Sequence, residues 1–420
     1  MSDTTLPEEL SRSGRICVLI AAFSGLVFDG FELGLMPVAS QSVTASLVGS
    51  AFTKTLGGNW FAWYMASLML GAAIGGIVLG SLGDRVGRTR AMGISILFYS
   101  LFAGMGGWVT TQEQMLVLRF LVGLGVGGMW PNGVALVAEC WPNTSRPLVS
   151  GILGAGINVG ILFLSQLTRI WPVTADSWRW IFQLSALPAL LGVVVLIALP
   201  ESPKWLATRG PSKKSNVPWR EFTRPPLSQA LFVGILLSSI PLIGAWAGSK
   251  WMIPWAEEVA GKVQTGYKSI TQGWWALGAT LGSFSGAQIA GLLGRQRSYF
   301  LISLGTTILT IALFQWTAPL EPSFLPIVFA QGFVSTLFFG WLPLYLPELF
   351  PTAVRATGTG VAMNTGRFVT AGGVLLAGTL FVLLGGKYPA VGTVVGLFYG
   401  LGMITIWFAP ETAGRSLDSK

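Results

Sequence analysis

The sequence predicts an all-α protein that crosses a membrane many times, and three observations support this. Apolar residues make up 52% of the 420-residue chain, whereas Asp, Glu, Lys and Arg together make up 10%, against about 25% in ordinary soluble proteins. Long apolar segments recur along the chain, each near the roughly 20 residues that a spanning helix needs. Because so few charges could not cover a soluble globule of this size, we expect a polytopic membrane protein.

Twelve spanning helices are expected, in two sets of six. They lie near residues 16–42, 59–81, 91–109, 116–138, 147–169, 179–199, 227–253, 270–291, 298–316, 323–346, 355–382 and 389–409. A membrane β-barrel would instead need short segments of alternating polarity. The polar stretch 201–226, rich in Pro, Lys and Arg, follows the sixth span. We therefore predict an N-terminal six-helix bundle over 1–200, a cytoplasmic linker over 201–226 and a C-terminal six-helix bundle over 227–420.

The distribution of basic residues orients the chain. An even number of spans puts both termini on one side, and seventeen Lys and Arg residues fall in loops on that side, against six on the other. Since positive loops stay in the cytoplasm, both termini are expected there, in the inner (plasma) membrane. The net charge of +9 is then explained by these loops, and no nucleic-acid partner is expected.

Composition also excludes several enzyme classes. The chain has no His and only two Cys, so a His-containing triad, a His-bound metal site and a disulfide framework all lack their parts. No nucleotide-binding loop of the form GxxxxGK[ST] is present. We therefore expect no enzyme, no metal and no cofactor, and an ion gradient, taken to be the proton gradient, as the energy source.

The two halves repeat each other. GAAIGG with GRTR in the first half matches GATLGS with GRQR in the second, and ECWPNTSRPLVSG matches ELFPTAVRATGTG. PES closes the sixth span as PET closes the twelfth, and every pair is separated by about 210 positions. A tandem duplication of a six-helix unit explains this order. Parallel repeats of this kind build transporters that open alternately to the two sides of the membrane.

The loop motifs resemble those of a known family. GSLGDRVGRTR (Gly80–Arg90), RFLVGLGVGG (Arg119–Gly128), LPESPKWL (Leu199–Leu206) and PETAGRSL (Pro410–Leu417) are similar to signatures of the major facilitator superfamily, with Thr89 where a base is usual. LPESPKWL and PETAGRSL resemble its sugar-porter and metabolite–proton symporter branches, and DGFELG (Asp29–Gly34) is most similar to its aromatic-acid and related organic-acid proton symporters. The resemblance implies two pseudo-symmetric six-helix bundles, the major facilitator fold.

The resemblance also implies ion-pair latches at the cytoplasmic ends of the helices, which hold the outward-facing state. The residues concerned are Asp84, Arg85, Arg88, Glu139, Arg146 and Glu201 in the first half, and Arg295, Glu348, Arg355 and Glu411 in the second. Gly291 stands where the counterpart of Asp84 would align. The alternative is that these basic loops only orient insertion into the membrane.

Charged residues inside the spans are candidates for proton coupling, since each costs about 2.5–3.5 kcal/mol or more at mid-bilayer. Asp29 and Glu32 are three residues apart on one face of the first span, roughly 20 and 24 Å from its inner end. Arg119, near the outer end of the fourth span, can meet either acid. In the resembling symporters such a pair carries the proton switch. The alternative is that Arg119 extends to the outer headgroups and Glu32 lines a vestibule.

Arg367 is the strongest indication of the substrate. It lies roughly 18 Å from the inner end of the eleventh span, with Asn364 one turn away. A guanidinium binds a carboxylate through two hydrogen bonds, so an anionic substrate fits; the alternative is a structural ion pair with Asp29 or Glu32.

Other polar and aromatic residues are weaker candidates for the substrate site. They are Asn158, Gln166, Trp341 and Tyr345. Lys250 is expected at the outer mouth, where Trp246, Trp251 and Trp255 form either a gate or an interfacial belt.

Together these features predict a proton-coupled symporter of a small organic anion, a monocarboxylate or aromatic acid, acting by alternating access as a monomer. A sugar or polyol symporter is the alternative, although the glutamines expected in its seventh span are missing. An exporter of organic cations, or a sensor that kept the fold without transport, also stays open.

Overall fold

The computed structural model describes residues 10–141, 146–207, 222–351 and 354–413. Within these ranges it is helical and contains no strand. Twelve helices are long and apolar enough to cross a membrane, and each falls on one of the predicted spans. The all-α membrane fold is therefore confirmed.

The first six spans are built from seven helices, because a short break divides the sixth. They are α1 (Arg12–Val48), α2 (Lys54–Val86), α3 (Arg88–Met105), α4 (Gln112–Cys140), α5 (Arg146–Ile170), and α6 (Arg179–Leu184) with α7 (Pro188–Ala198). The short α8 (Pro203–Ala207) follows them.

Two of the last six spans, the seventh and the twelfth, are divided between two α-helices. The seventh consists of α9 (Leu227–Ile243), a π-helical turn (Gly244–Gly248), a 3₁₀ turn (Ser249–Trp251) and α10 (Met252–Ala260). The others are α11 (Tyr267–Leu293), α12 (Arg295–Ile311), α13 (Phe324–Tyr345), α14 (Arg355–Leu383), and α15 (Tyr388–Gly396) with α16 (Phe398–Thr405). The seventh span thus differs from the single helix expected, and its wide turn lies just after Pro241, which cannot donate a backbone hydrogen bond.

Local sequence explains where several helices begin. The Thr53 hydroxyl accepts a hydrogen bond from the backbone N–H of Leu56, at 3.1 Å, at the start of α2. At the start of α4, Thr111 and Gln114 cap each other reciprocally. The turns after α2 and α11 pass through Gly87 and Gly294, whose φ angles are 116° and 87°. Only glycine adopts such angles readily, so the two halves repeat this turn because they repeat its glycine.

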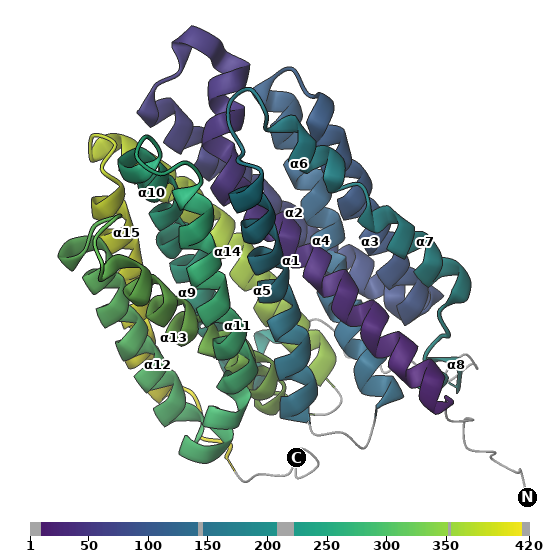
Figure 1. Ribbon diagram of the computed structural model, residues 1–420. Coiled ribbons are helices and arrows are strands. Elements are labelled where there is room, and N and C mark those ends of the chain that lie inside the picture. Colours follow the sequence, from purple (N-terminus) through teal and green to yellow (C-terminus); the bar gives the residue numbers. More distant parts are fainter. Residues whose placement is uncertain (1–9, 142–145, 208–221, 352–353, 414–420) are drawn as a thin grey trace, which may run out of the picture.

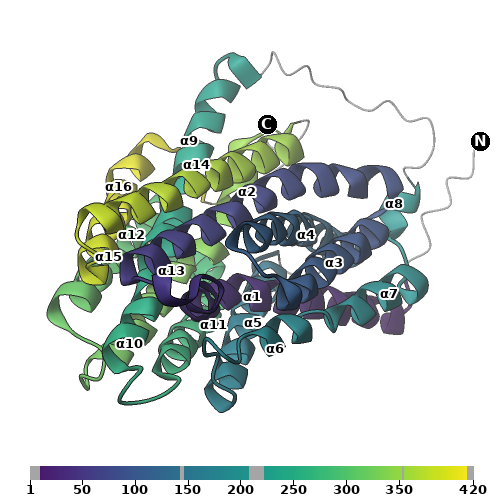
Figure 2. The same ribbon diagram turned by 90° about the horizontal axis from the view of Figure 1, so that it is seen from above.

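The two sets of six spans lie side by side (Figure 1). Extensive packing joins them along two helix pairs, α5 with α11 and α2 with α14, the latter seen from above in Figure 2. The described chain begins and ends at the same end of the bundle. We call this the terminal end, and the opposite one the distal end.

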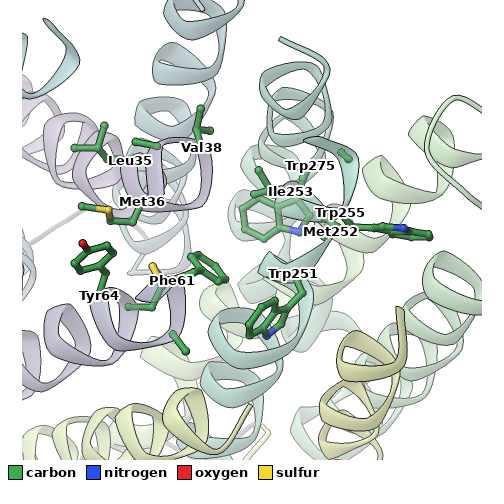
Figure 3. Packing of buried hydrophobic residues seen from close by; sticks show 14 of the residues in the cluster. Leu35, Met36, Val38, Phe61, Tyr64, Trp251, Met252, Ile253, Trp255 and Trp275 are labelled. Carbon is green, nitrogen blue, oxygen red and sulfur yellow. The ribbon is translucent and has the colours of Figure 1, made fainter. Parts of the chain in front are cut away.

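Aromatic side chains close the distal end between the halves. Phe61 of α2 meets the edge of Trp251 with ring centroids 5.1 Å apart, and Trp251 stacks on Phe381 of α14 at 4.9 Å. Figure 3 shows Phe61 and Trp251 facing each other across this contact. Such pairs contribute about 0.5–1.5 kcal/mol each beyond the apolar area that they bury.

Close helix contact at one glycine gives a test of the packing. A Cβ atom on Gly30 of α1 would collide with the backbone carbonyl of Ile157 in α5, whereas one on Gly372 of α14 would meet nothing within 4 Å. We expect Gly30→Ala to destabilise the protein by about 1–3 kcal/mol through overpacking. Gly372→Ala should be neutral or slightly stabilising, because Ala favours helix more than Gly.

Apparent melting temperatures in detergent compare the two variants. An unchanged value for Gly30→Ala, or an equal loss in both, would mean that α1 and α5 do not approach so closely.

Candidate functional site

A central cavity lies between the two halves. Its walls come from α1, α2, α4 and α5 of the first half, and from α9, its π-helical turn, α11, α13 and α14 of the second. The polar lining residues are Asp29, Asn158, Thr336 and Arg367, and most others are apolar or aromatic. A mostly apolar cavity with a few convergent polar groups is typical of a small-molecule site.

Arg367 and Asp29 face this cavity from opposite halves. Arg367 is half-buried, and its Nη1 donates to the Ala72 carbonyl at 3.3 Å and to Asn364 Oδ1 at 3.4 Å. Among the described residues, its Nε and Nη2 have no acceptor. Asp29 is 2% exposed, and its Oδ1 has no hydrogen-bond partner. The two opposite charges therefore share the cavity without forming an ion pair in the described part of the chain.

Glu32 and Arg119 form a separate, fully buried ion pair. Arg119 Nη1 lies 3.2 Å from Glu32 Oε2, and the two side chains are 0% and 2% exposed. The Arg119 guanidinium also lies over the Phe182 ring, 5.4 Å from its centroid. Because three residues turn a helix by 300°, Glu32 points about 60° away from Asp29, toward α4. Arg119 therefore meets one of the two acids, as expected, and the alternative that it extends to the outer headgroups is wrong: its side chain is fully buried, and α4 begins two turns earlier, at Gln112.

The other predicted substrate residues divide into two groups. Asn158 lines the cavity and joins the halves, since its Nδ2 donates to Ser283 Oγ at 2.8 Å. Asn364 supports Arg367 through the hydrogen bond given above. Gln166 is exposed, because eight residues beyond Asn158 turn α5 by about 80° from the cavity face.

The structure places Trp341 and Tyr345 away from the cavity. They stack on each other at 4.4 Å between ring centroids and are fully buried in the second half. Trp341 Nε1 donates to the Arg295 carbonyl and Tyr345 Oη to the Pro410 carbonyl. Their expected contact with substrate is therefore wrong in this structure, since both side chains are used to hold the terminal end together.

Lys250 is not at the outer mouth, as expected, but buried. Its side chain is 0% exposed, and its Nζ lies 3.2 Å from the centroid of the Trp275 ring and 5.4 Å from that of Trp246. The π-helical turn just before it displaces this segment from the path of a regular α-helix. Trp246 and Trp275 line the cavity, whereas Trp251 and Trp255 do not and pack against phenylalanine rings instead.

The charges predicted to form latches pair within each half. In the first half, Arg88 pairs with Asp84 and, at 3.3 Å, with Glu139. Glu139 also accepts from the Ser202 hydroxyl, and Glu201 accepts from the backbone N–H of Thr89 at 3.1 Å. Arg85 is exposed. The side chain of Arg146 lies outside the described residues.

The second half repeats these bonds. Arg295 donates to Glu348 at 2.7 and 3.1 Å, and Glu348 accepts from the Thr412 hydroxyl. Arg355 Nε donates to the Pro347 carbonyl at 3.1 Å. Partial burial of Glu411 opposes its ionisation, but hydrogen bonds from the backbone N–H groups of Gln296, Ala413, Arg295 and Thr412 outweigh it and hold its pKa below the usual value. Among the described residues no ion pair at the terminal end joins the two halves, so these charges brace each half internally.

Polar ties between the halves lie at the distal end instead. Lys54 Nζ is 2.5 Å from Glu258 Oε1. Lys268 Nζ donates across the halves to the Val173 carbonyl at 3.0 Å and to Ser42 Oγ at 3.4 Å, and within its own half to Glu257 Oε1 at 3.2 Å. Together with the contact of Phe61 and Trp251, these ties hold the distal end closed.

Several cavity residues went unrecognised in the sequence, among them the polar Thr336 and the aromatic Trp130. Trp130 lines the cavity from α4. Eleven residues separate it from Arg119, which is close to three full turns, so both lie on one face of the helix. Because a buried arginine marks the inward face of α4, the position of Trp130 on that same face could have indicated that it lies near the cavity.

Comparison with known families and proteins identifies the fold. The model of the Major Facilitator Superfamily matches residues 17–255, more than half of the chain. The model described as "Sugar (and other) transporter" matches residues 209–419. The xylose transporter of E. coli, in a partially occluded inward open conformation, superimposes with a TM-score of 0.70 at 18% identity, covering 96% of this chain and 100% of that one. At that identity the likeness shows the fold alone.

Two curated bacterial relatives are similar over nearly their full length. The cis,cis-muconate transport protein of Acinetobacter baylyi is 29% identical over 408 residues, which cover 92% of this chain and 95% of the relative. The probable 4-methylmuconolactone transporter of Cupriavidus pinatubonensis is 28% identical over 410 residues, with 95% and 91% covered.

The Glu32–Arg119 pair predicts a large loss of stability when one partner is removed. Arg119→Met leaves a buried carboxylate without its cation, which should cost about 3–5 kcal/mol of unfolding free energy. Adding Glu32→Gln should restore most of that loss. Lys54→Met is the control, because its pair with Glu258 is about 40% exposed and such pairs contribute only about 0–1 kcal/mol.

Thermal unfolding of the four proteins in detergent measures these differences. If the double variant is no more stable than Arg119→Met, the two charges do not compensate each other.

Proposed function

This chain belongs to the major facilitator superfamily and is a multi-pass membrane transporter of a small molecule, and we propose that it couples the import of a small organic anion to protons. Its site, on this proposal, is the central cavity, with Arg367 as the anion ligand. The protein acts as a monomer in the inner membrane with cytoplasmic termini. The energy source is the proton gradient, and no cofactor takes part.

One observation carries the assignment of an anion. The Nε and Nη2 edge of Arg367 has no acceptor among the described residues, while Nη1 is held by Ala72 and Asn364. That edge is the fork with which a guanidinium binds a carboxylate through two parallel hydrogen bonds. The curated relatives above include one named for an organic acid, which supports the same class.

Asp29 is the proposed proton carrier, because it shares the cavity with Arg367. While the cavity is empty, the positive guanidinium favours the ionised carboxylate. A substrate carboxylate that binds Arg367 neutralises the charge of the guanidinium and brings a negative charge close to Asp29. Both effects favour protonation of Asp29, whose Oδ1 has no partner. Anion and proton would then bind together, which is the requirement for symport.

Glu32 and Arg119 have a different proposed role. Their ion pair is closed and lies outside the cavity lining, so neither group exchanges protons directly with the cavity. We assign to them a positioning role: they fix α1 against α4 and thereby hold Asp29, one turn away, at the cavity wall.

Alternating access requires one end of the cavity to open while the other closes. The ties of Lys54 and Lys268 at the distal end support a state closed there, in which the substrate would exchange through the terminal end. The described braces at the terminal end each close within one half, so a separation of the halves there would break none of them. The second state needs the reverse change, by rocking of one bundle on the other.

A sugar or polyol symporter is the second candidate. It is favoured by the match of residues 209–419 to the sugar transporter model and by three indole rings, those of Trp130, Trp246 and Trp275, that line the same cavity as Asn158. Apolar sugar faces stack on such rings. Arg367 weighs against this reading and against an exporter of organic cations, since a neutral or positive ligand would leave its charge uncompensated.

Binding to purified protein tests the anion. We expect organic acids, but not sugars or amines, to raise the melting temperature. Arg367→Ala should weaken that binding about 10- to 100-fold, the effect of losing hydrogen bonds to a charged group, and Arg367→Lys should weaken it less. Arg169→Ala, at an exposed arginine, should bind as the unmodified protein does. Unchanged binding by Arg367→Ala would remove its role, and stabilisation by sugars alone would favour the second candidate.

Transport into proteoliposomes tests the proton carrier. Asp29→Asn should lose accumulation driven by an acidic exterior, because no proton can bind, while exchange of labelled for unlabelled substrate continues. The comparison is the double variant that carries both Glu32→Gln and Arg119→Gln. Its substrate accumulation should still respond to the pH difference across the membrane. Loss of that response in the double variant alone would assign the proton to Glu32 instead.

A further inference from the structure

Lys250 is a buried cation that the proposed mechanism does not use. Its ammonium is fully buried and has no hydrogen-bond partner, and within the described ranges no carboxylate pairs with it. Its contacts are two indole faces, Trp275 at 3.2 Å and Trp246 at 5.4 Å from the ring centroids. Cation–π contact compensates only part of the loss of hydration, so a methionine could fill this space at lower cost.

The aromatic cage around Lys250 is held in place by a chain of buried hydrogen bonds. Trp275 Nε1 donates to Gln331 Oε1 at 2.8 Å, and Gln331 Nε2 donates to Ser249 Oγ at 2.6 Å. Ser249 precedes Lys250 in the chain. These hydrogen bonds therefore fix the Trp275 ring with its face toward the Lys250 ammonium. A lysine that merely fills space would not need its neighbouring ring to be held in this way.

The cage borders the central cavity. Trp246 and Trp275 both line it, together with Arg367. Trp246 precedes Lys250 by four residues, and the Lys250 side chain runs back toward that ring. Gly366 packs against Ser238, so the backbone of Arg367 lies about level with that part of α9. The backbone of Lys250 lies roughly 16–18 Å farther along the span, toward the distal end. Arg367 thus lines the cavity directly, whereas the Lys250 ammonium lies behind the two indole rings that line it at a separate level.

We propose that Lys250 is a second anion subsite at the distal end of the central cavity, and that the transported substrate is a dianion such as a dicarboxylate. This rests on the proposed function, in which Arg367 binds the first carboxylate. The second carboxylate replaces an indole face as the partner of the ammonium. With Asp29 protonated and Glu32 paired to Arg119, the two remaining cations balance the two negative charges of such a substrate.

Matched acids and monoamides test the proposal on the full-length purified protein. The probes are succinate, adipate and terephthalate, each compared with its own monoamide, which keeps the size but carries one charge. We expect at least one diacid to bind about tenfold more tightly than its monoamide, a ratio typical of one added charge-assisted hydrogen bond. Lys250→Met should reduce this ratio to about one, and Lys250→Arg should keep most of it.

Three outcomes separate the proposal from simpler explanations. If Arg367-dependent binding occurs but no diacid is preferred, or if Lys250→Met keeps the preference, the second subsite is wrong while the anion site stands. If Lys250→Met only lowers the melting temperature of the empty protein, Lys250 is a packing residue and the proposal is likewise wrong. If no acid binds, both this proposal and the proposed function fail.

Discussion

Every charge placed inside this bundle must be balanced there, because a bilayer offers no water to do so. Five ionisable side chains near the centre meet this constraint in different ways. Glu32 and Arg119 neutralise each other at 3.2 Å. Asp29 and Arg367 share one cavity without direct contact, and Lys250 has only indole faces. The first pair is complete without a ligand, whereas the other three groups are left with unused bonding capacity facing or bordering the cavity.

The duplication explains why the charged terminal ends are rigid within each half. Arg88 bonds Glu139 as Arg295 bonds Glu348, and Glu201 caps α3 as Glu411 caps α12. The bonds recur at the positions where the sequence motifs recur, so the motifs encode one brace used twice. Because each brace closes inside its own bundle, the bundles can move as units while their internal packing is preserved.

The fold was predictable from sequence because apolar length, loop charge and repetition all lie along the chain itself. The site was less predictable because it depends on rotation about helix axes and on breaks within them. Gln166 was assigned to the cavity by its polarity, yet its angle on α5 turns it outward. Lys250 was assigned to the outer mouth from a regular rise of 1.5 Å per residue, which a π-helical turn does not follow. The separation of Asp29 from Glu32 likewise needed the position of α4.

The break in the seventh span also determines how much of the protein has to move. Glu258, which pairs with Lys54 across the halves, lies on α10, beyond the π-helical turn Gly244–Gly248, whereas Lys268, which bonds Ser42 and Val173 across the halves, lies on α11. A bend at that turn would swing α10 away from its partners while α9 stays packed in its bundle. Such a bend would release the pair of Lys54 and Glu258 by moving about one-third of a span, whereas the bonds of Lys268 to Ser42 and Val173 would break only when α11 moves with its bundle.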